Sequence, residues 1–149
     1  NHPETLTTMH NLSFSYSKQG RFSECKPLLV DCFIARKEVL GEAHPDTLST
    51  MNSLAGLYSD QGNYDESELL QVECLKLQKE ALGETHLDTI TSMNNLALLY
   101  FDQGRNEESE ALYVECLKLA TETLGENHPE TLFIEKNLKI VREKLPNSE

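Results

Sequence analysis

Gly83–Gly125 has the sequence GETHLDTITSMNNLALLYFDQGRNEESEALYVECLKLATETLG, and the rest of the chain repeats it. The preceding copy begins at Gly41 and has the sequence GEAHPDTLSTMNSLAGLYSDQGNYDESELLQVECLKLQKEALG. An earlier copy begins at His2, and a partial fourth begins at Gly125. One histidine near the start of each copy, the repeat-start histidine, recurs every 42 residues, at His2, His44, His86 and His128. A fixed period of this size predicts a solenoid of stacked repeats.

Each copy contains two helical patterns. In the third copy the first pattern is an apolar stripe at helical spacing, formed by Ile90, Met93, Ala97 and Tyr100. The second is a face that recurs every seven residues and carries small side chains, which allow close approach of neighbouring helices. Its members in the third copy are Ser109, Leu112, Cys116 and Leu119. One such helix pair cannot bury its own apolar stripe, so the copies are expected to stack on one another.

The ends of the helices are also marked. Proline follows the repeat-start histidine in three copies, as at Pro45, and proline suits the first position of a helix because its missing N–H costs nothing there. We therefore interpret the repeat-start histidines as helix caps. Gly104 is expected to supply the positive φ of the turn between the two helices, and Gly125 to cap the second helix.

The pattern N-L-A-x-L-Y-x-x-Q-G resembles a tetratricopeptide repeat (TPR). Asn95, Leu96, Ala97, Tyr100 and Gly104 match the first-helix signature of that family. The usual TPR period is about 34 residues. A period of 42 with the pattern G-x-x-H-P-x-T-L, complete at Gly41 and Gly125, resembles the kinesin light chain type of repeat, in which each helix is longer. The resemblance implies a protein-interaction module whose first helices line a concave groove.

The predicted fold is all-α, a right-handed α-solenoid of antiparallel helix pairs with a capping helix at the C-terminal end. We expect residues 1–149 to form one TPR domain with repeats 2–41, 44–83 and 86–125 and a capping helix over 129–145. Polar residues replace the apolar ones on one side of that last helix, as at Glu135, Lys139 and Arg142. A solvated outer face of this kind is typical of the cap that a solenoid requires.

The composition excludes several classes of partner. The formal net charge is −12, which argues against nucleic acid, since a phosphate backbone attracts clustered Lys and Arg. No apolar run approaches the length of a membrane span or a signal peptide, so no membrane partner and a cytoplasmic location are expected. The chain begins within a repeat and without Met, at Asn1-His2-Pro3, which predicts a segment of a longer array.

No cofactor and no metal are expected. Three of the four cysteines, Cys32, Cys74 and Cys116, hold the same position in successive copies and are expected to be buried thiols too far apart for disulfides. With one repeat-start histidine per copy, these side chains stay apart, whereas a zinc site needs ligands that converge on one point. The sequence contains no phosphate-binding loop, nucleophile elbow or H-E-x-x-H motif, so the chain is not expected to be an enzyme.

The repeat pattern places a set of polar and apolar first-helix residues on the predicted groove. Asparagine suits such a surface because its amide both donates and accepts hydrogen bonds, so it can hold a peptide backbone of any sequence. Apolar side chains would anchor the ligand. The candidate groove residues are His10, Asn11, Phe14, Lys18, Asn52, Ser53, Asn94, Asn95, Leu98, Phe101 and Lys136.

Two functions remain open at this point. In the first, the groove binds a protein or peptide. The kinesin light chain resemblance implies acidic ligands held by basic groove residues, but Asp60 and Asp102 stand where Lys or Arg would serve, and only Lys18 is basic there. A neutral or basic peptide therefore fits the charge better than an acidic one.

In the second possible function, the repeats are a passive spacer or scaffold within a larger signalling or motor-adaptor protein, and the asparagines satisfy contacts between helices.

Overall fold

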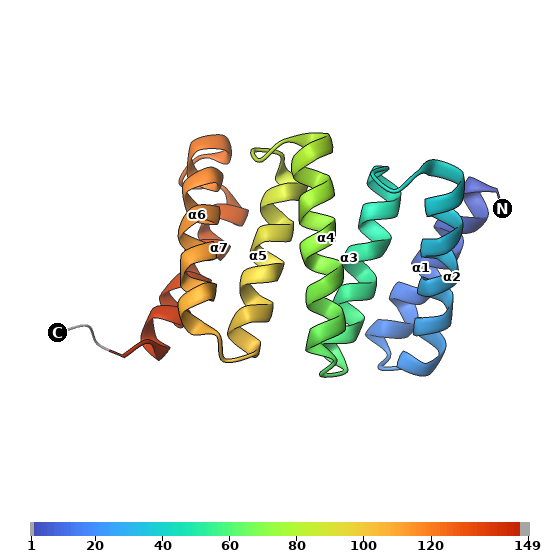
Figure 1. Cartoon of the computed structure of the whole chain (residues 1–149), viewed down its shortest axis with the longest axis horizontal. Helices are drawn as coiled ribbons and strands as arrows, with labels where there is room; N and C mark the ends of the chain where they lie inside the picture. Colours follow the sequence, from blue (N-terminus) through green and yellow to red (C-terminus); the bar gives the residue numbers. More distant parts are fainter. Residues whose placement is uncertain (1, 147–149) are drawn as a thin grey trace. The chain divides into compact units, whose positions relative to one another are not determined.

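The computed structural model describes residues 2–146 of the chain, and all regular secondary structure in that part is α-helical (Figure 1). Within it, seven helices follow one another through short turns. Residue 1 and residues 147–149, which the expected domain 1–149 includes, lie outside the described residues. The helices are α1 (Pro3–Lys18), α2 (Phe22–Leu40), α3 (Pro45–Asp60), α4 (Tyr64–Leu82), α5 (Leu87–Asp102), α6 (Asn106–Leu124) and α7 (Pro129–Lys144).

The repeat-start histidines cap the first helix of each repeat, as expected. In each case the imidazole Nδ1 accepts a hydrogen bond from the backbone N–H two residues later, at 3.2 Å in His44 and 3.1 Å in His86. His2 and His128 make the same contact with Glu4 and Glu130. The first N–H groups of a helix have no partner within it, so the cap satisfies one of them. The motif thus fixes where α1, α3, α5 and α7 begin.

A glycine ends the turn between the two helices of each repeat. Gly104 has a φ of 77°, which an L side chain rarely adopts. This geometry lets the Gly104 N–H donate to the Phe101 carbonyl at 2.9 Å and the Arg105 N–H donate to the Tyr100 carbonyl at 2.8 Å. Carbonyls at the end of α5 are thereby satisfied before α6 begins in the opposite direction (Figure 1).

The helices group into two compact units, which divide within α4. The first extends to Leu77 and the second begins at Gln78.

In the first unit α2 packs against both α1 and α3. One core cluster joins α2 and α3 through Cys25, Leu29, Leu54 and Leu57, each at most 5% exposed. A second joins α1 and α2 through Leu6 and other small or apolar side chains. Leu48 and Met51 of α3 pack with Cys74 of α4. The remaining members of the second cluster are Cys32 and Ala35.

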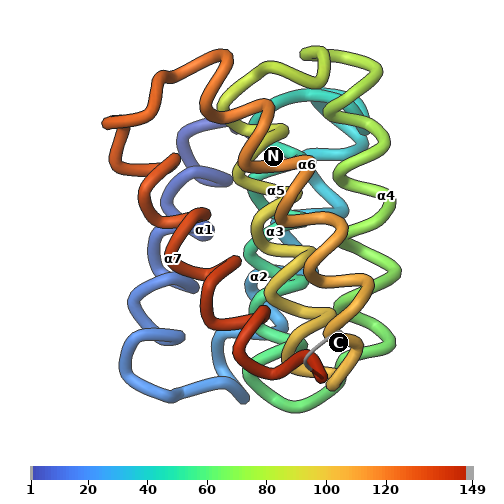
Figure 2. The backbone as a smooth tube through the Cα atoms, turned by 90° about the vertical axis from the view of Figure 1, so that its left-hand side faces the viewer, coloured from blue at the N-terminus to red at the C-terminus, as the bar shows by residue number. Residues whose placement is uncertain are grey.

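In the second unit α6 packs against α5 and α7, and α7 also contacts α5 (Figure 2). Three of the four members of the apolar stripe expected on α5 are fully buried, with Ile90, Met93 and Ala97 at 0% exposure, while Tyr100 is half-buried. From α7, Ile134 and Leu138 are buried as well. The 3.6-residue period in the sequence therefore identifies the packed face of this helix correctly.

Small polar side chains fasten the two helices of a repeat together. The Cys32 thiol donates to the Leu6 carbonyl at 3.3 Å, and the Cys116 thiol makes the equivalent contact with Ile90 at 3.4 Å. At the other crossing point the Ser109 hydroxyl donates to the Ala97 carbonyl at 2.7 Å. All four cysteines are buried and free, as the repeat pattern predicts.

The seven-residue pattern of the second helix also predicts Val39 and Ala81 on its buried face, but both are exposed, Val39 by 49%. The second helices have 19 residues and extend past the 16-residue first helices. In the sequence Pro27 would fall in the tolerated first turn only if the second helix began late, but α2 begins at Phe22 and encloses it. A proline there removes the N–H that would bond to the carbonyl of Ser23, and the exposed position of Ser23 allows water to replace that bond.

Candidate peptide-binding surface

All the predicted groove residues lie on the first helix of a repeat. Those of the first unit come from α1 and α3, and those of the second unit come from α5 and α7. The former are His10, Asn11, Phe14, Lys18, Asn52 and Ser53, and the latter are Asn94, Asn95, Leu98, Phe101 and Lys136.

In the first unit a cavity of about 440 Å³ brings four of these residues together. His10, Phe14 and Lys18 line it from α1, and Ser53 lines it from α3. Asn11 and Asn52 do not line it, although Asn11 is exposed and Asn52 is half-buried. The other residues that line this cavity are Ser13, Ser17, Cys25, Leu29, Gly56, Leu57 and Asp60.

Gly56 keeps the α3 side of this cavity open. A Cβ atom built at Gly56 would meet no other atom within 4 Å, so the neighbouring side chains do not fill the space. The buried side chains of Cys25, Leu29 and Leu57 form an apolar floor. A glycine inside a helix costs about 1 kcal/mol relative to alanine, so this opening is maintained at a cost in stability.

The rim of the cavity carries an aromatic ring and charges of both signs. Phe14 is 59% exposed, and the Lys18 ammonium lies 5.2 Å from the centre of its ring, within the range of a cation–π contact. Asp60, the last residue of α3, is exposed on the facing helix. The cavity therefore combines an apolar interior with groups at its edge that bind charge.

His10 at the inner end of the cavity belongs to a contact among three helices. Its Nδ1 lies 3.5 Å from the Thr50 hydroxyl of α3. The Arg36 guanidinium of α2, only 4% exposed, donates to that hydroxyl at 2.7 Å and to the Asp46 carbonyl at 3.0 Å. Burial lowers the pKa of His10, the nearby Arg36 charge lowers it further, and Asp46 partly opposes them. The pKa of His10 therefore lies below its ordinary value, and the ring lies beside a buried cation.

In the second unit one predicted residue is out of reach of a ligand. Asn94 is 4% exposed, and its side-chain oxygen accepts a hydrogen bond from the Asn137 amide of α7 at 3.4 Å. The structure thus corrects the placement of Asn94 on an open surface, because the next first helix covers it. Leu98 is 40% exposed, Asn95 and Phe101 are half-buried, and Lys136 is exposed.

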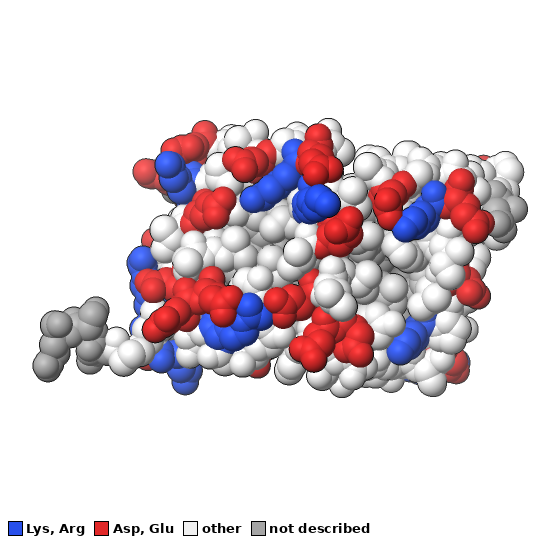
Figure 3. Space-filling model, in the orientation of Figure 1, with Lys and Arg blue, Asp and Glu red and all other residues white. Residues whose placement is uncertain are grey.

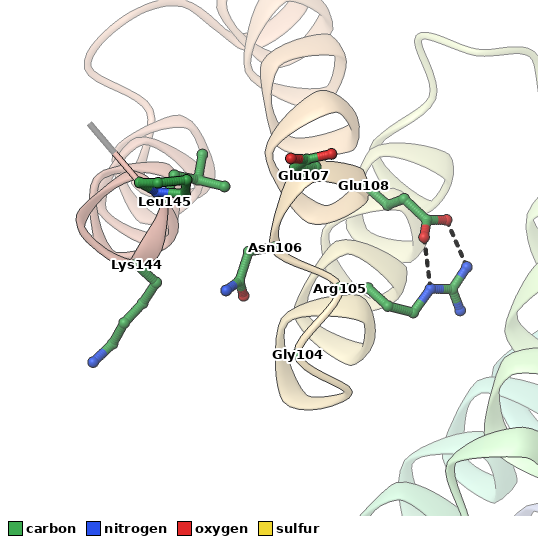
Figure 4. A pocket seen from close by; sticks show the side chains of 8 residues that line it. Gly104, Arg105, Asn106, Glu107, Glu108, Lys144 and Leu145 are labelled. Atoms are coloured by element: carbon green, nitrogen blue, oxygen red, sulfur yellow. Dashed lines mark hydrogen bonds and ion pairs between the residues drawn. The ribbon is translucent and has the colours of Figure 1, made fainter. Parts of the chain in front are cut away.

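A second cavity, of about 320 Å³, lies between the turn that precedes α6 and the end of α7 (Figure 4). Asn106 lines it, at the position that Phe22 and Tyr64 hold in the other repeats. Arg105, also in its lining, donates two hydrogen bonds to Glu108, at 2.9 and 2.6 Å. The polar replacement at 106 therefore coincides with unfilled space beside the start of α6.

Charges of both signs are interspersed on the face shown in Figure 3, and the described residues form no broad cluster of Lys and Arg there. Within residues 2–146 no group of three or more His, Cys, Asp or Glu side chains is arranged to hold a metal ion. None of the described helices has the length and apolar character that a membrane span needs.

Sequence reasoning missed the residues beneath the surface. Arg36 and Thr50 hold His10 in place, and Cys25 and Leu29 form the floor of the larger cavity. Leu29 and Arg36 lie on the second helix, which the repeat pattern excludes from the groove. An arginine next to the small residue Ala35 on an otherwise apolar face was the available signal for a buried polar contact.

Family models of the tetratricopeptide repeat match almost the whole described chain. One matches residues 4–80 and 53–105, and another matches residues 89–130. The chain belongs to the tetratricopeptide repeat family. No curated protein gave a significant match to this TPR chain.

Solved TPR structures have the same fold. A kinesin light chain-like protein of Podosopora anserina with nearly identical TPR-like repeats is 25% identical, with a TM-score of 0.86 over 97% of this chain and 68% of that one. BtubC (BKLC) from P. vanneervenii is 15% identical, with a TM-score of 0.72 over 97% of this chain and 67% of that one. The Sgt2 TPR domain from Aspergillus fumigatus is 12% identical, with a TM-score of 0.65 over 99% and 88%.

These matches support an all-α TPR solenoid of the kinesin light chain type. TPR repeats are generally protein-interaction modules, and proteins with this fold are typically scaffolds without catalytic activity.

Proposed function

We propose that this TPR chain is a non-enzymatic interaction module that holds a peptide or a partner helix on the open faces of its first helices. The observation that carries the proposal is the cavity between α1 and α3, lined by His10, Phe14, Lys18 and Ser53. It offers both an apolar interior and hydrogen-bonding groups, the combination that peptide recognition uses. The second unit has an open face of its own, which carries Asn95, Leu98 and Phe101.

Charge favours a neutral or basic ligand. The chain carries a formal net charge of −12, and Asp60 lies at the rim of the cavity. Complementary charge steers association and disfavours partners of the same sign. The net negative charge of the chain would repel an acidic peptide.

We further propose a cytoplasmic location. All four cysteines are free and buried, which suits a compartment that keeps thiols reduced.

The alternative is a passive spacer within a larger signalling or motor-adaptor protein. The contact between Asn94 and Asn137 favours it, because there a predicted ligand-binding asparagine serves the packing of the repeats. This alternative predicts that changes on the open faces leave binding to any partner unaffected.

A peptide array separates the two functions. Phe14→Ala and Asn95→Ala remove side chains from the open faces of α1 and α5, and both are expected to weaken binding to array peptides several-fold. Leu69→Ala is the matched control, since Leu69 is the most exposed large apolar side chain and lies on a second helix. Equal binding by the unaltered protein and all three variants would support the spacer and would mean that the open faces do not bind the peptides.

A further inference from the structure

The larger cavity lies where the first unit has smaller residues than the second unit at equivalent positions. Gly56 of α3 corresponds to Ile140 of α7 in the 42-residue register, and Leu29 of α2 corresponds to Tyr113 of α6. In the second unit the isoleucine and the fully buried tyrosine therefore occupy positions where the first unit has a glycine and a leucine. The same architecture thus holds larger side chains in one unit and leaves space in the other.

The interior of this space suits an apolar group. Cys25, Leu29 and Leu57 beneath it are each at most 3% exposed, and Phe14 forms a wall that is itself 59% exposed. Covering Phe14 and filling the space above Gly56 would remove apolar surface from water, which is favourable at roughly 25 cal/mol per Å². Because Gly56 adds no side chain, an apolar group of a ligand can enter the space above it.

The edge of the space suits a cation. The Asp60 carboxylate is exposed and ends α3, where the helix dipole also favours positive charge. Lys18 on the opposite edge is directed to the Phe14 ring. A basic group of the ligand can therefore pair with Asp60, whereas an acidic group would meet that carboxylate and the end of the helix.

We infer that the Gly56 cavity is a specificity pocket for a peptide in which one large apolar side chain lies one or two residues from a lysine or arginine. The apolar side chain fills the space above Gly56, and the basic side chain pairs with Asp60. This inference rests on the proposed function, because it names the ligand of the same surface.

Gly56→Leu tests the pocket without disturbing the fold. The backbone at Gly56 is helical with no positive φ, and an added Cβ meets nothing within 4 Å. Leucine is also the residue at the equivalent position of α5, Leu98. The variant should unfold at the same or a higher temperature than the unaltered protein, since glycine weakens a helix. Loss of binding by a stably folded variant then reports on the pocket alone.

The probes are three fluorescein-labelled nonapeptides with a Gly/Ser host sequence and the central residues Leu-Ser-Lys, Ala-Ser-Lys or Leu-Ser-Glu. Fluorescence anisotropy measures their affinity for the whole chain. We expect the Leu-Ser-Lys peptide to bind, and replacing its leucine by alanine to weaken binding about tenfold. Replacing its lysine by glutamate should weaken binding up to about fivefold, as one exposed ion pair allows. Gly56→Leu should lose about tenfold for the Leu-Ser-Lys peptide.

The outcomes separate this inference from the proposed function. If Gly56→Leu binds the Leu-Ser-Lys peptide as well as the unaltered protein does, or if the glutamate peptide binds best, the pocket inference is wrong. If Phe14→Ala and Asn95→Ala still weaken binding on the array in that case, the open faces remain the binding surface. Absence of binding by all three probes at millimolar concentration also overturns the inference, while the array result decides the proposed function independently.

Discussion

At the scale of single residues, each repeat-start histidine has a defined structural task. Its Nδ1 accepts the hydrogen bond of an otherwise unpaired N–H, and its position sets the first residue of the helix that carries the open face. The 42-residue recurrence of histidine is thus a recurrence of helix starts. Each repeat therefore has one such histidine because each repeat starts one such helix.

Replacing His44 by alanine tests this role. The change removes the acceptor for the Asp46 N–H at the start of α3 and is expected to lower the free energy of unfolding by about 1 kcal/mol. His44→Asn is the control, because asparagine is a strong N-cap residue and should retain most of the stability. Urea denaturation measures both. Equal stability of the alanine and asparagine variants would show that the cap contributes little.

His10 makes stability depend on pH. Burial and the Arg36 charge lower its pKa below the ordinary value of 6.5, so the unfolded chain binds a proton more readily than the folded chain does. The groups that face it are Arg36 from α2 and Thr50 and Asp46 from α3. The contribution of neutral His10 is therefore complete above about pH 6.5 and is lost as the pH falls below that value.

The matched variant for this effect is His10→Asn, since Asn52 and Asn94 hold the same position in the other repeats. Between pH 7.5 and pH 5, the unaltered protein should lose more free energy of unfolding than the variant does. Chemical denaturation of both proteins across this range measures the difference. A difference that stays constant with pH would mean that His10 titrates normally in the folded chain.

At the scale of helices, α6 lacks the aromatic side chain with which the second helix of the other two repeats begins. The first and second repeats begin their second helix with Phe22 and Tyr64, whereas α6 begins with Asn106 beside a cavity (Figure 4). Asn106→Tyr should fill part of that space and stabilise the protein by about 0.5–2 kcal/mol, in the range of cavity-filling substitutions. Thermal unfolding compares it with Asn106→Ala, which removes the amide without filling the space. A tyrosine variant no more stable than the alanine variant would contradict this account of the cavity.

Burial on the second helices should also protect the cysteine thiols from chemical reaction. Burial raises the pKa of Cys116 to about 12, with smaller contributions from Glu130 and Glu115, and burial likewise raises the pKa of Cys25 and Cys32. Since the thiolate is the reactive form, the native protein should not react with a thiol reagent such as dithiobis-nitrobenzoate at pH 8. All four cysteines should react after denaturation. Rapid reaction of the native protein would place a cysteine-bearing face in contact with water.

Much of the helical level was predictable from the sequence because its causes are local. The repeat-start histidine and the turn glycine fix helix ends, and the spacing of Ile90, Met93 and Ala97 fixes the buried face of α5. Features that depend on neighbouring repeats could not be predicted from the pattern within one repeat. Asn94 is buried because Asn137 of a later helix reaches it, and no periodicity within α5 reveals that contact. The cavity above Gly56 likewise depends on the side chains of other helices, which do not fill the space there.

At the scale of the whole molecule, the two helices of each repeat have different roles. Small residues on the second helix, such as Cys32, Cys116 and Ser109, fasten it to the first, while the first helix leaves a face accessible in each unit. An amide chemical-shift experiment on the ¹⁵N-labelled chain, titrated with the Leu-Ser-Lys nonapeptide, tests this difference in roles most directly. We predict shifts on first helices, at Phe14 and Ser53 of the first unit above all, and none at Leu69 or Val114 on the second helices. Shifts confined to the second helices, with the first helices unaffected, would contradict it.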